Sequence, residues 1–259
     1  MRRTALVTGA SSGLGAEFVR TLAGEGHDVV LVARRAAAME SLAAEVEERH
    51  DVTATVIPMD LARPNAADEV VQRLGEVPIN VLVNNAGFNL FGPFVELSEQ
   101  EMVEQLNVNV VTLVQLTRLL LPGMLERRRG IVVNMASNAA FQPGPLMATY
   151  YASKAFVLNF SLALTEEVRG SGVTVTALCP GPVATGFQER ASMEDSKLVA
   201  GRKLASSAEV VAWGWAEAKR GRPMAVHTPR WRSVAFATRF MPRSTMARMA
   251  MKAQERVER

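Results

Sequence analysis

Two adjacent tyrosines and a lysine are the residues of this chain whose types and spacing best suit acid–base chemistry. Tyr150 and Lys154 are four residues apart and Tyr151 and Lys154 are three apart, so either tyrosine can share a helix face with the lysine. A phenol with its usual pKa near ~10 exchanges its proton poorly at neutral pH, and a neighbouring ammonium group lowers that pKa. The pair therefore predicts a proton donor for a developing alkoxide, and the spacing alone leaves both tyrosines open.

A glycine-rich turn follows the first apolar run of the chain. Its residues are Thr8-Gly9-Ala10-Ser11-Ser12-Gly13-Leu14-Gly15. Glycines here let the backbone turn tightly and let N–H groups approach a pyrophosphate, which then faces a helix N-terminus. A turn that binds nothing is the alternative. The position in the first strand–helix unit favours a dinucleotide cofactor.

The elements that must position these residues are visible in the hydrophobic pattern. Apolar runs rich in valine, leucine and isoleucine occur at Thr4–Thr8, Asp28–Val32, Thr53–Ile57, Asn80–Asn84, Gly130–Met135, Thr174–Cys179 and Pro223–Val226. Segments of helical period lie at 12–25, 36–50, 64–74, 99–121, 150–170 and 207–220, and Ser98 and Ser206 begin capping boxes. Continuously apolar strands, each followed by a helix, indicate a parallel sheet covered on both faces. We expect one α/β domain over 1–259, with a doubly wound parallel sheet of about seven strands.

The composition is typical of a soluble globular protein. The chain has 259 residues, of which 48% are hydrophobic and 21% are charged. The single cysteine, Cys179, excludes an intramolecular disulfide and suits a reducing compartment. The first apolar run is too short for a signal peptide, and no unbroken apolar stretch approaches the ~18 residues of a membrane span. We therefore expect a cytoplasmic location.

The glycine spacing, Gly-x-x-x-Gly-x-Gly after a threonine, resembles that of the short-chain dehydrogenase/reductase family. The family's Tyr-x-x-x-Lys motif maps onto Tyr150 and Lys154, and its catalytic serine maps onto Ser137. Asn109 matches a fourth catalytic position, in a register set by the Leu-Pro-Gly-Met segment that begins at Leu121. The resemblance covers roughly the first 185 residues and implies a Rossmann-type fold with Asn109, Ser137, Tyr150 and Lys154 as catalytic residues.

The same resemblance implies a role for each catalytic residue. Ser137 would hydrogen-bond the substrate carbonyl and stabilise the oxyanion. Asn109 would bend a helix and hold a water that passes protons to Lys154. The implied reaction is hydride transfer between nicotinamide C4 and a carbonyl carbon while Tyr150 protonates the oxygen, or the reverse. We expect an enzyme for a small carbonyl or alcohol substrate, assembled as a homodimer or homotetramer. A non-catalytic NADP(H)-binding regulator and a redox-linked epimerase or isomerase are the alternatives.

The end of the second apolar run bears on the choice of cofactor. It closes with Arg34 and Arg35, without the carboxylate that NAD-preferring sites use for the ribose 2′-hydroxyl. A guanidinium forms paired, charge-assisted hydrogen bonds to a 2′-phosphate. Arg34 aligns with the family's phosphate-binding arginine and Arg35 can share the role; two solvated arginines at a helix start are the alternative. We expect NADP(H) in preference to NAD(H).

Further cofactor contacts follow from the resemblance. Asp60 resembles the acceptor for the adenine amino group, with the Leu61 backbone beside it. The segment from Asn84 to Gly87 matches one that lies along the cofactor's ribose, and Asn84 itself is expected to serve the sheet. No metal is expected. The expected cofactor-binding residues are Gly9, Ser11, Ser12, Gly13, Leu14, Gly15, Arg34, Arg35, Asp60, Leu61, Asn85, Ala86, Gly87, Tyr150, Lys154, Pro180, Gly181, Val183 and Thr185.

Charge is distributed unevenly along the chain. Residues 1–218 contain 18 basic and 24 acidic residues, whereas residues 219–259 contain 11 basic and 2 acidic ones. The polar segment 186–206 is expected to form a substrate lid. The basic extension 228–259 has apolar residues at helical spacing, and Pro242 prevents one continuous helix.

Three roles suit the basic extension 228–259. We favour a helical flap that packs on the substrate pocket or a partner subunit. A basic amphipathic segment at a membrane surface and a docking site for acyl-thioester phosphates are the alternatives. Nucleic-acid binding has no supporting motif in the sequence.

Overall fold

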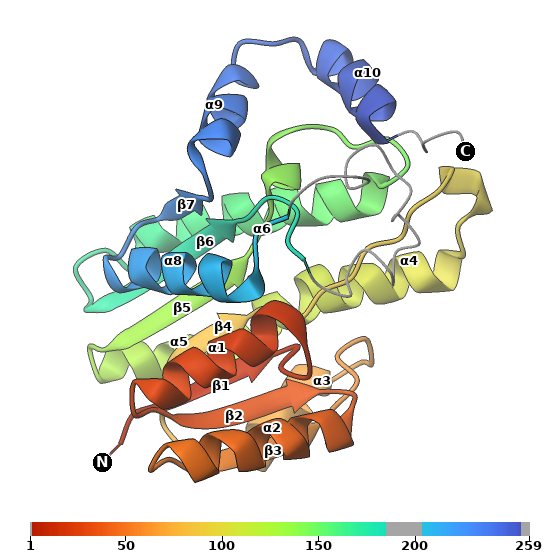
Figure 1. Ribbon diagram of the computed structural model, residues 1–259. Coiled ribbons are helices and arrows are strands. Elements are labelled where there is room, and N and C mark those ends of the chain that lie inside the picture. The colour runs from red at the N-terminus through yellow and green to blue at the C-terminus, as the bar shows by residue number, and fades with distance from the viewer. Residues whose placement is uncertain (1, 185–203, 255–259) are drawn as a thin grey trace.

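The computed structural model describes residues 2–184 and 204–254, and a single parallel sheet runs through them (Figure 1). The strand order is β3–β2–β1–β4–β5–β6–β7. The strands are β1 (Thr4–Thr8), β2 (Asp28–Ala33), β3 (Ala54–Pro58), β4 (Ile79–Asn84), β5 (Gly130–Met135), β6 (Val173–Cys179) and β7 (Met224–Val226). Each of the expected apolar runs forms one of these strands, so the doubly wound sheet is confirmed.

Two layers of helices cover the sheet, because the central strands are apolar on both faces. On β1, Ala5 and Val7 belong to one core cluster, and Leu6 between them belongs to the other. The first cluster packs under α1 (Gly13–Gly24), α2 (Ala36–Arg49) and α8 (Ser207–Lys219). The second packs under α3 (Ala66–Leu74), α5 (Thr112–Glu126) and α6 (Ala148–Glu167).

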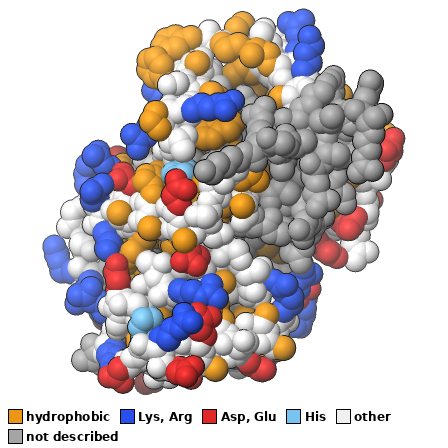
Figure 2. Space-filling view, viewed as in Figure 1, with side chains coloured by type: hydrophobic (Ala, Val, Ile, Leu, Met, Phe, Trp, Pro, Cys, Tyr) orange, Lys and Arg blue, Asp and Glu red, His pale blue; other side chains and the backbone are white. Residues whose placement is uncertain are grey.

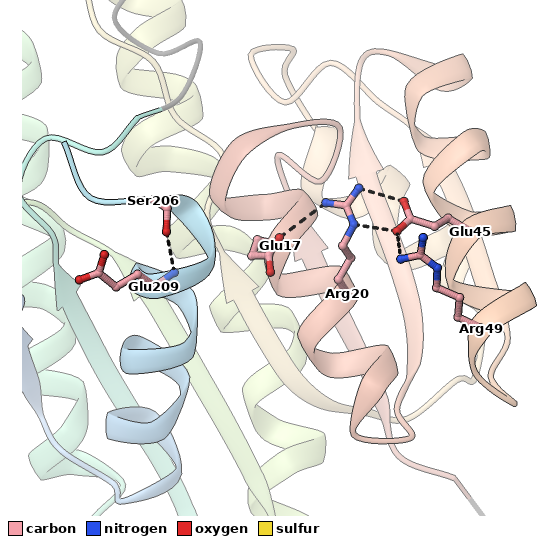
Figure 3. Close-up of polar contacts among 6 residues, drawn as sticks. All are labelled: Glu17, Arg20, Glu45, Arg49, Ser206 and Glu209. Atoms are coloured by element: carbon pink, nitrogen blue, oxygen red, sulfur yellow. Dashed lines mark hydrogen bonds and ion pairs between the residues drawn. The ribbon is translucent and has the colours of Figure 1, made fainter. Parts of the chain in front are cut away.

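Polar contacts shown in Figure 3 support the first of these layers. Arg20 on α1 donates two hydrogen bonds to the carboxylate of Glu45 on α2, at 3.0 and 2.9 Å. Arg49, one turn along α2, pairs with the same carboxylate at 2.8 Å. At the start of α8 the Ser206 hydroxyl accepts a bond of 3.2 Å from the N–H of Glu209. This contact confirms the expected capping box.

The helical run expected over 99–121 is interrupted in the structure. It consists of α4 (Glu99–Leu106), one π-helical turn (Asn107–Val111) and α5, which continues past Pro122 to Glu126. Ser98 caps α4 through the N–H of Glu101, as expected. Pro122 removes one backbone hydrogen bond without ending α5, because the last turn stays anchored by Met124, a fully buried side chain.

Glu99–Glu126 is also the one stretch, in the part of the chain that the structure describes, that is long and apolar enough to cross a membrane. Length and composition alone give this result. Leu113 and Leu116 on its inner face are buried, and Leu116 belongs to the core cluster beneath α5. Only 33% of its apolar window is buried, so the stretch packs on the core along one face and is exposed along the other.

Buried asparagines tie the centre of the sheet together. Asn84 on β4 lies opposite Asn134 on β5, and Nδ2 of Asn84 donates to Oδ1 of Asn134 at 2.9 Å. Nδ2 of Asn134 donates in turn to Ser161 of α6 at 2.9 Å. Asn84 therefore serves the sheet, as expected.

After β7 the chain leaves the sheet and forms an arch at one end of the molecule (Figure 1). It contains α9 (Pro229–Ala237) and α10 (Arg243–Gln254), separated at Pro242. The expected break at this proline is confirmed. Met246, Ala250 and Gln254 are buried, at the four-residue spacing that puts them on the inner face of α10.

Candidate active site

A cavity of about 480 Å³ opens at the carboxyl ends of the strands. The strand order reverses between β1 and β4, and such a switch point is where doubly wound sheets bind ligands. The expected site residues that line the cavity are Gly9, Ser11, Ser12, Gly13, Leu14, Arg34, Arg35, Asp60, Leu61, Asn85, Ala86, Gly87, Ser137, Tyr150, Lys154, Pro180, Gly181 and Val183. Thr185 and most of the expected lid over 186–206 lie outside the described residues.

Tyr150 lies in the first turn of α6, is half-buried and lines the cavity. Loss of water around the phenol disfavours its ionised form and raises the pKa of Tyr150 to about 12. A hydrogen bond with the Ser137 side chain acts in the opposite direction. Nζ of Lys154 lies 5.7 Å from the centre of the Tyr150 ring.

The direction of this pKa shift corrects the expectation from the lysine alone. The ammonium of Lys154 was expected to lower the pKa of Tyr150, whereas burial is the largest influence on that pKa and raises it. Burial acts on the lysine as well and lowers the pKa of Lys154 to about 8. Its Nζ donates a 2.7 Å hydrogen bond to the carbonyl of Met135, at the end of β5. Tyr150 is therefore a neutral phenol at neutral pH. The pKa of the neighbouring Lys154, about 8, lies much closer to neutral pH.

Ser137 follows β5 and is held in place by its own turn. Its Oγ accepts a bond of 3.1 Å from the N–H of Ala139 and donates one of 3.1 Å to Oδ1 of Asn138. The serine is buried, at 8% exposure, on the wall that faces Tyr150. The hydroxyl is thus fixed next to the phenol at the position where a substrate oxygen would meet both.

Asn109 lies behind the cavity, within the π-helical turn. Its Oδ1 accepts from the N–H of Phe88 at 3.1 Å, and its Nδ2 donates to the carbonyl of Phe88 and to Ser153, each at 3.1 Å. The widened turn agrees with the expected bend in the helix. The side chain anchors the segment after β4 to α6, and its expected part in holding a water stays a prediction.

The two tyrosines that share a helix face with Lys154 have different hydrogen-bond partners in the structure. The ring of Tyr151 packs on Met147 and Ala139, and its hydroxyl accepts a bond of 2.7 Å from Nε2 of Gln254 on α10. Burial raises the pKa of Tyr151 to about 12 as well. Tyr150 is the tyrosine with a hydrogen bond to the Ser137 side chain, whereas the hydroxyl of Tyr151 is bonded to α10.

The glycine turn has the backbone geometry that a bound pyrophosphate requires. Gly9 has a φ of +67°, and a Cβ placed there would lie 2.8 Å from Nδ2 of Asn85. Gly15 lies behind the cavity surface, where a Cβ would come within 2.2 Å of the Gly9 carbonyl. Within the described residues no side chain caps the start of α1, and Ser12 and Gly13 of that end line the cavity. Glycine residues and free first-turn N–H groups therefore fit a phosphate at this point.

Arg34 and Arg35 follow β2 and lie next to the glycine turn. Both side chains are exposed at the cavity wall. Arg35 donates to Oγ of Ser12 at 2.7 Å and to Oγ of Ser11 at 3.2 Å. Two guanidinium groups and two hydroxyls thus gather at one end of the cavity, a donor set that fits a phosphate monoester.

Asp60 and the backbone of Leu61 form the neighbouring wall. Oδ1 of Asp60 accepts a bond of 3.1 Å from the N–H of Ala62, and the Leu61 carbonyl accepts one of 2.8 Å from Thr112. The other carboxylate oxygen of Asp60 is not used in that turn. The arrangement is compatible with the expected adenine contact.

Several cavity residues escaped the sequence analysis. Phe88, Asn89, Glu104 and Met147 extend the wall beyond Tyr150. They come from three different segments, and no motif relates them in sequence. Trp231 on α9 also escaped the sequence analysis; this residue packs on the cavity residue Gly181, and its Nε1 lies only 2.2 Å from where a Cβ on Gly181 would be.

The chain matches the family model described as short chain dehydrogenase over residues 3–196. Among curated proteins it is similar to a very-long-chain 3-oxoacyl-CoA reductase of Laccaria bicolor, 42% identical over 178 residues, which are 67% of this chain and 53% of that protein. A protein of the same name from Anas platyrhynchos is 37% identical over 70% of this chain and 60% of that protein. The chain spans only about half the length of the first of these relatives.

Solved structures are similar over nearly the whole chain. A short-chain dehydrogenase from Sphingobium yanoikuyae in complex with NADPH has a TM-score of 0.82 and 31% identity, and the match covers 92% of this chain and 94% of that one. The bulky-bulky ketone specific alcohol dehydrogenase from Comamonas testosteroni has a TM-score of 0.79 and 30% identity, covering 92% of each chain. The chain therefore belongs to the short chain dehydrogenase family and is an oxidoreductase of that family.

Proposed function

We propose that this enzyme interconverts a ketone and a secondary alcohol with NADP(H), and that Tyr150 is its general acid and base. The observation that carries the proposal is the grouping of Tyr150, Ser137 and Lys154 at one wall of the cavity, where the phenol and the serine share a hydrogen bond. NADPH supplies the hydride when it is bound. The protein's own residues must then hold the substrate oxygen and deliver a proton to it.

Each residue has a distinct part in the reduction. Ser137 donates a hydrogen bond to the carbonyl oxygen, which polarises the carbon that accepts the hydride. Tyr150 transfers its proton to the oxygen as the C–O double bond becomes single, so the products are an alcohol and a transient phenolate. Lys154 stabilises that phenolate by its charge. With the pKa of Tyr150 at about 12, the phenol is in the form that reduction needs at neutral pH.

The preference for NADP(H) rests on the end of β2. Arg34 and Arg35, with Ser11 and Ser12, supply donors that suit the 2′-phosphate. A similar structure was determined with NADPH. These contacts bear on the choice between NADP(H) and NAD(H). The nicotinamide end of the site has no part in that choice, because this end is the same in both cofactors.

We propose a bulky, largely apolar ketone as the substrate class. Phe88, Ala139, Met147 and Tyr151 line the cavity beside Tyr150. The similar proteins are described as reducing long 3-oxoacyl thioesters or as specific for ketones with two bulky groups. A carbonyl flanked by apolar groups would place those groups against this wall.

The proposal is tested with purified full-length protein, NADPH and a panel of bulky ketones and 3-oxoacyl thioesters. NADPH oxidation should accompany alcohol formation, and Tyr150→Phe should lower kcat by at least about a hundredfold. Tyr151→Phe is the matched phenol deletion: it removes a hydroxyl bonded to α10, so kcat should stay within a few-fold of wild type even if KM rises as the cavity wall loosens. Equal rates for wild type and Tyr150→Phe would contradict the assignment of Tyr150 as the general acid and base.

The same assay separates the alternatives. A non-catalytic regulator would bind NADPH without turnover across the panel. An epimerase or isomerase would form product without net loss of NADPH. The intact grouping of Ser137, Tyr150 and Lys154 favours a net oxidoreductase over both.

We also propose a homodimer or homotetramer. Exposed apolar residues lie on α4, on the π-helical turn, on α5 and on α6, and they are Val103, Leu106, Val111, Leu119 and Phe156. Burying such a face against a second copy removes apolar surface from water. Light scattering on a size-exclusion column gives the mass of wild type and of Val111→Glu. A monomeric wild type would contradict the proposal.

A cytoplasmic location is also proposed. Cys179 is buried and carries a free thiol, which suits a reducing compartment. Cell fractionation with a tagged full-length chain tests this location.

A further inference from the structure

The arch formed by residues 229–254 presents large apolar side chains to solvent. Its exposed apolar residues are Val234, Phe236, Phe240, Met249 and Met251. Phe236 and Phe240 are 60% and 75% exposed, and their rings form an edge-to-face pair with centres 5.2 Å apart. Two neighbouring phenyl rings in water are costly, so this tip of the arch is a candidate contact surface.

The same arch carries positive charge only. Its basic residues, all exposed, are Arg230, Arg232, Arg239, Arg243, Arg248 and Lys252. The sequence from 229 to 254 contains no aspartate or glutamate, whereas residues 1–218 have an excess of acidic residues. Figure 2 shows hydrophobic and basic side chains together over α9 and α10. A partner for this surface must therefore be negatively charged and must also accept apolar side chains.

The arch is held to the rest of the protein mainly by its buried residues and not by its exposed ones. Met246, Ala250 and Gln254 form the buried inner face of α10, and Ala235 is buried on α9. The phenylalanines, the two exposed methionines and the basic residues lie outside that packing, apart from Arg232, which donates a 3.1 Å bond to the carbonyl of Val226. Changing the others should leave the arch in place, so the outer surface can be tested separately from the fold.

We propose that the arch docks this enzyme onto the surface of a membrane that contains anionic lipids. The phenyl rings and thioethers enter the boundary between headgroups and acyl chains, and the arginines pair with lipid phosphates and carboxylates. Like charges oppose contact between the arches of two copies. A nucleic acid would neutralise the arginines but would leave the aliphatic side chains exposed. A membrane surface with anionic lipids can contact both the apolar and the basic side chains of the arch.

The test is sedimentation of full-length protein with vesicles of phosphatidylcholine alone and with added phosphatidylserine. Wild type should bind only the anionic vesicles, and concentrated salt should release it. Arg239→Glu/Arg243→Glu and Phe236→Ser/Phe240→Ser should each lower the partition coefficient by about tenfold or more. Arg49→Glu/Arg73→Glu, on α2 and α3, makes the same charge change elsewhere and should bind as wild type does.

Other results would overturn the proposal. One is wild type that stays in the supernatant with anionic vesicles; another is arch variants that bind as well as wild type. Arch-dependent binding of a labelled oligonucleotide without vesicle binding would assign the surface to nucleic acid. A change in mass by light scattering, confined to the arch variants and without vesicle binding, would assign it to a second copy. Thermal unfolding and far-ultraviolet circular dichroism of both arch variants should match wild type, since all of their changed side chains are exposed.

Discussion

The hydroxyl of Tyr151 accepts a 2.7 Å hydrogen bond from Nε2 of Gln254, across 103 positions of sequence. Both side chains are buried, at 6% and 1% exposure. The bond joins α10 to the residue that follows the proposed proton donor, and Tyr151 lines the cavity. The end of the chain thereby becomes part of the wall of the active site.

Breaking this contact should release α10. Tyr151→Phe leaves the buried amide of Gln254 without this partner, which costs about 1–3 kcal/mol, and Gln254→Leu should cost less because the Tyr151 hydroxyl keeps a bond with Gln142. The double variant removes both partners and should cost less than the sum, with a coupling of about 1 kcal/mol. Tryptic cleavage within 243–254, followed by mass spectrometry, measures the release. Single variants that are cleaved no faster than wild type would contradict the contact.

The rate of ketone reduction should fall as the pH rises through about 8. Lys154 has a pKa lowered to about 8, so its charge is present below that pH and is lost above it. Tyr150 keeps its proton up to about 12 and adds no loss in the working range. A kcat/KM profile for reduction between about pH 6 and 10 measures the effect. Lys154→Arg keeps the charge and should move the fall to higher pH; an unmoved profile would exclude Lys154 as its source.

Alcohol oxidation should respond to pH in the opposite direction. It needs the Tyr150 phenolate, which a pKa of about 12 makes scarce at neutral pH. The oxidation rate should therefore rise with pH across the same range, measured as NADPH formation from the matching alcohol. A flat profile would show that ionisation of Tyr150 does not limit the reaction.

Arg34→Ala and Arg35→Ala should each raise the Kd of NADPH by about tenfold or more. A charged hydrogen bond to the 2′-phosphate contributes about 1.5–3 kcal/mol, and NADH lacks that phosphate. The Kd of NADH should change much less, although Arg35→Ala also frees Ser11 and Ser12 from their contacts. Fluorescence titration of both cofactors gives the four constants. Equal losses for NADPH and NADH would remove the 2′-phosphate role.

Gly181→Ala should destabilise the protein through α9. The added Cβ would lie 2.2 Å from Nε1 of Trp231, so the indole must move, at about 1–3 kcal/mol. The backbone of Gly181 lies outside the left-handed region and accepts alanine. Trp231→Leu in the same chain removes the clash, so the double variant should be more stable than Gly181→Ala alone. Denaturant unfolding checks the order, and a double variant of lower stability would place the strain elsewhere.

The strands, the break at Pro242 and the glycine turn could be predicted from the sequence. The seven apolar runs form the seven strands, because continuous apolarity suits strands buried on both faces. Pro242 separates α9 from α10, as expected from its missing N–H. Glycines at 9, 13 and 15 shape the turn before α1. Each of these features depends on a residue and its near neighbours in sequence.

Two features of the helices could not be predicted from the sequence. They are the continuation of α5 past Pro122 and the π-helical turn at Asn107–Val111. Both depend on what the helix packs against. Met124 holds the last turn of α5 to the core, and Asn109 bonds to Phe88 and Ser153 on other segments. Sequence periodicity reports the apolar face of a helix and not the tertiary contacts that distort it.

By itself the sequence determined the fold class, the glycine turn and the Tyr-x-x-x-Lys spacing, because these are set by residue type and separation along the chain. Only the tertiary structure showed that Tyr150 is bonded to Ser137 while the hydroxyl of Tyr151 is bonded to Gln254, far along the sequence. It also decided that the pKa of Tyr150 is raised, because exclusion of water depends on every segment that surrounds the phenol.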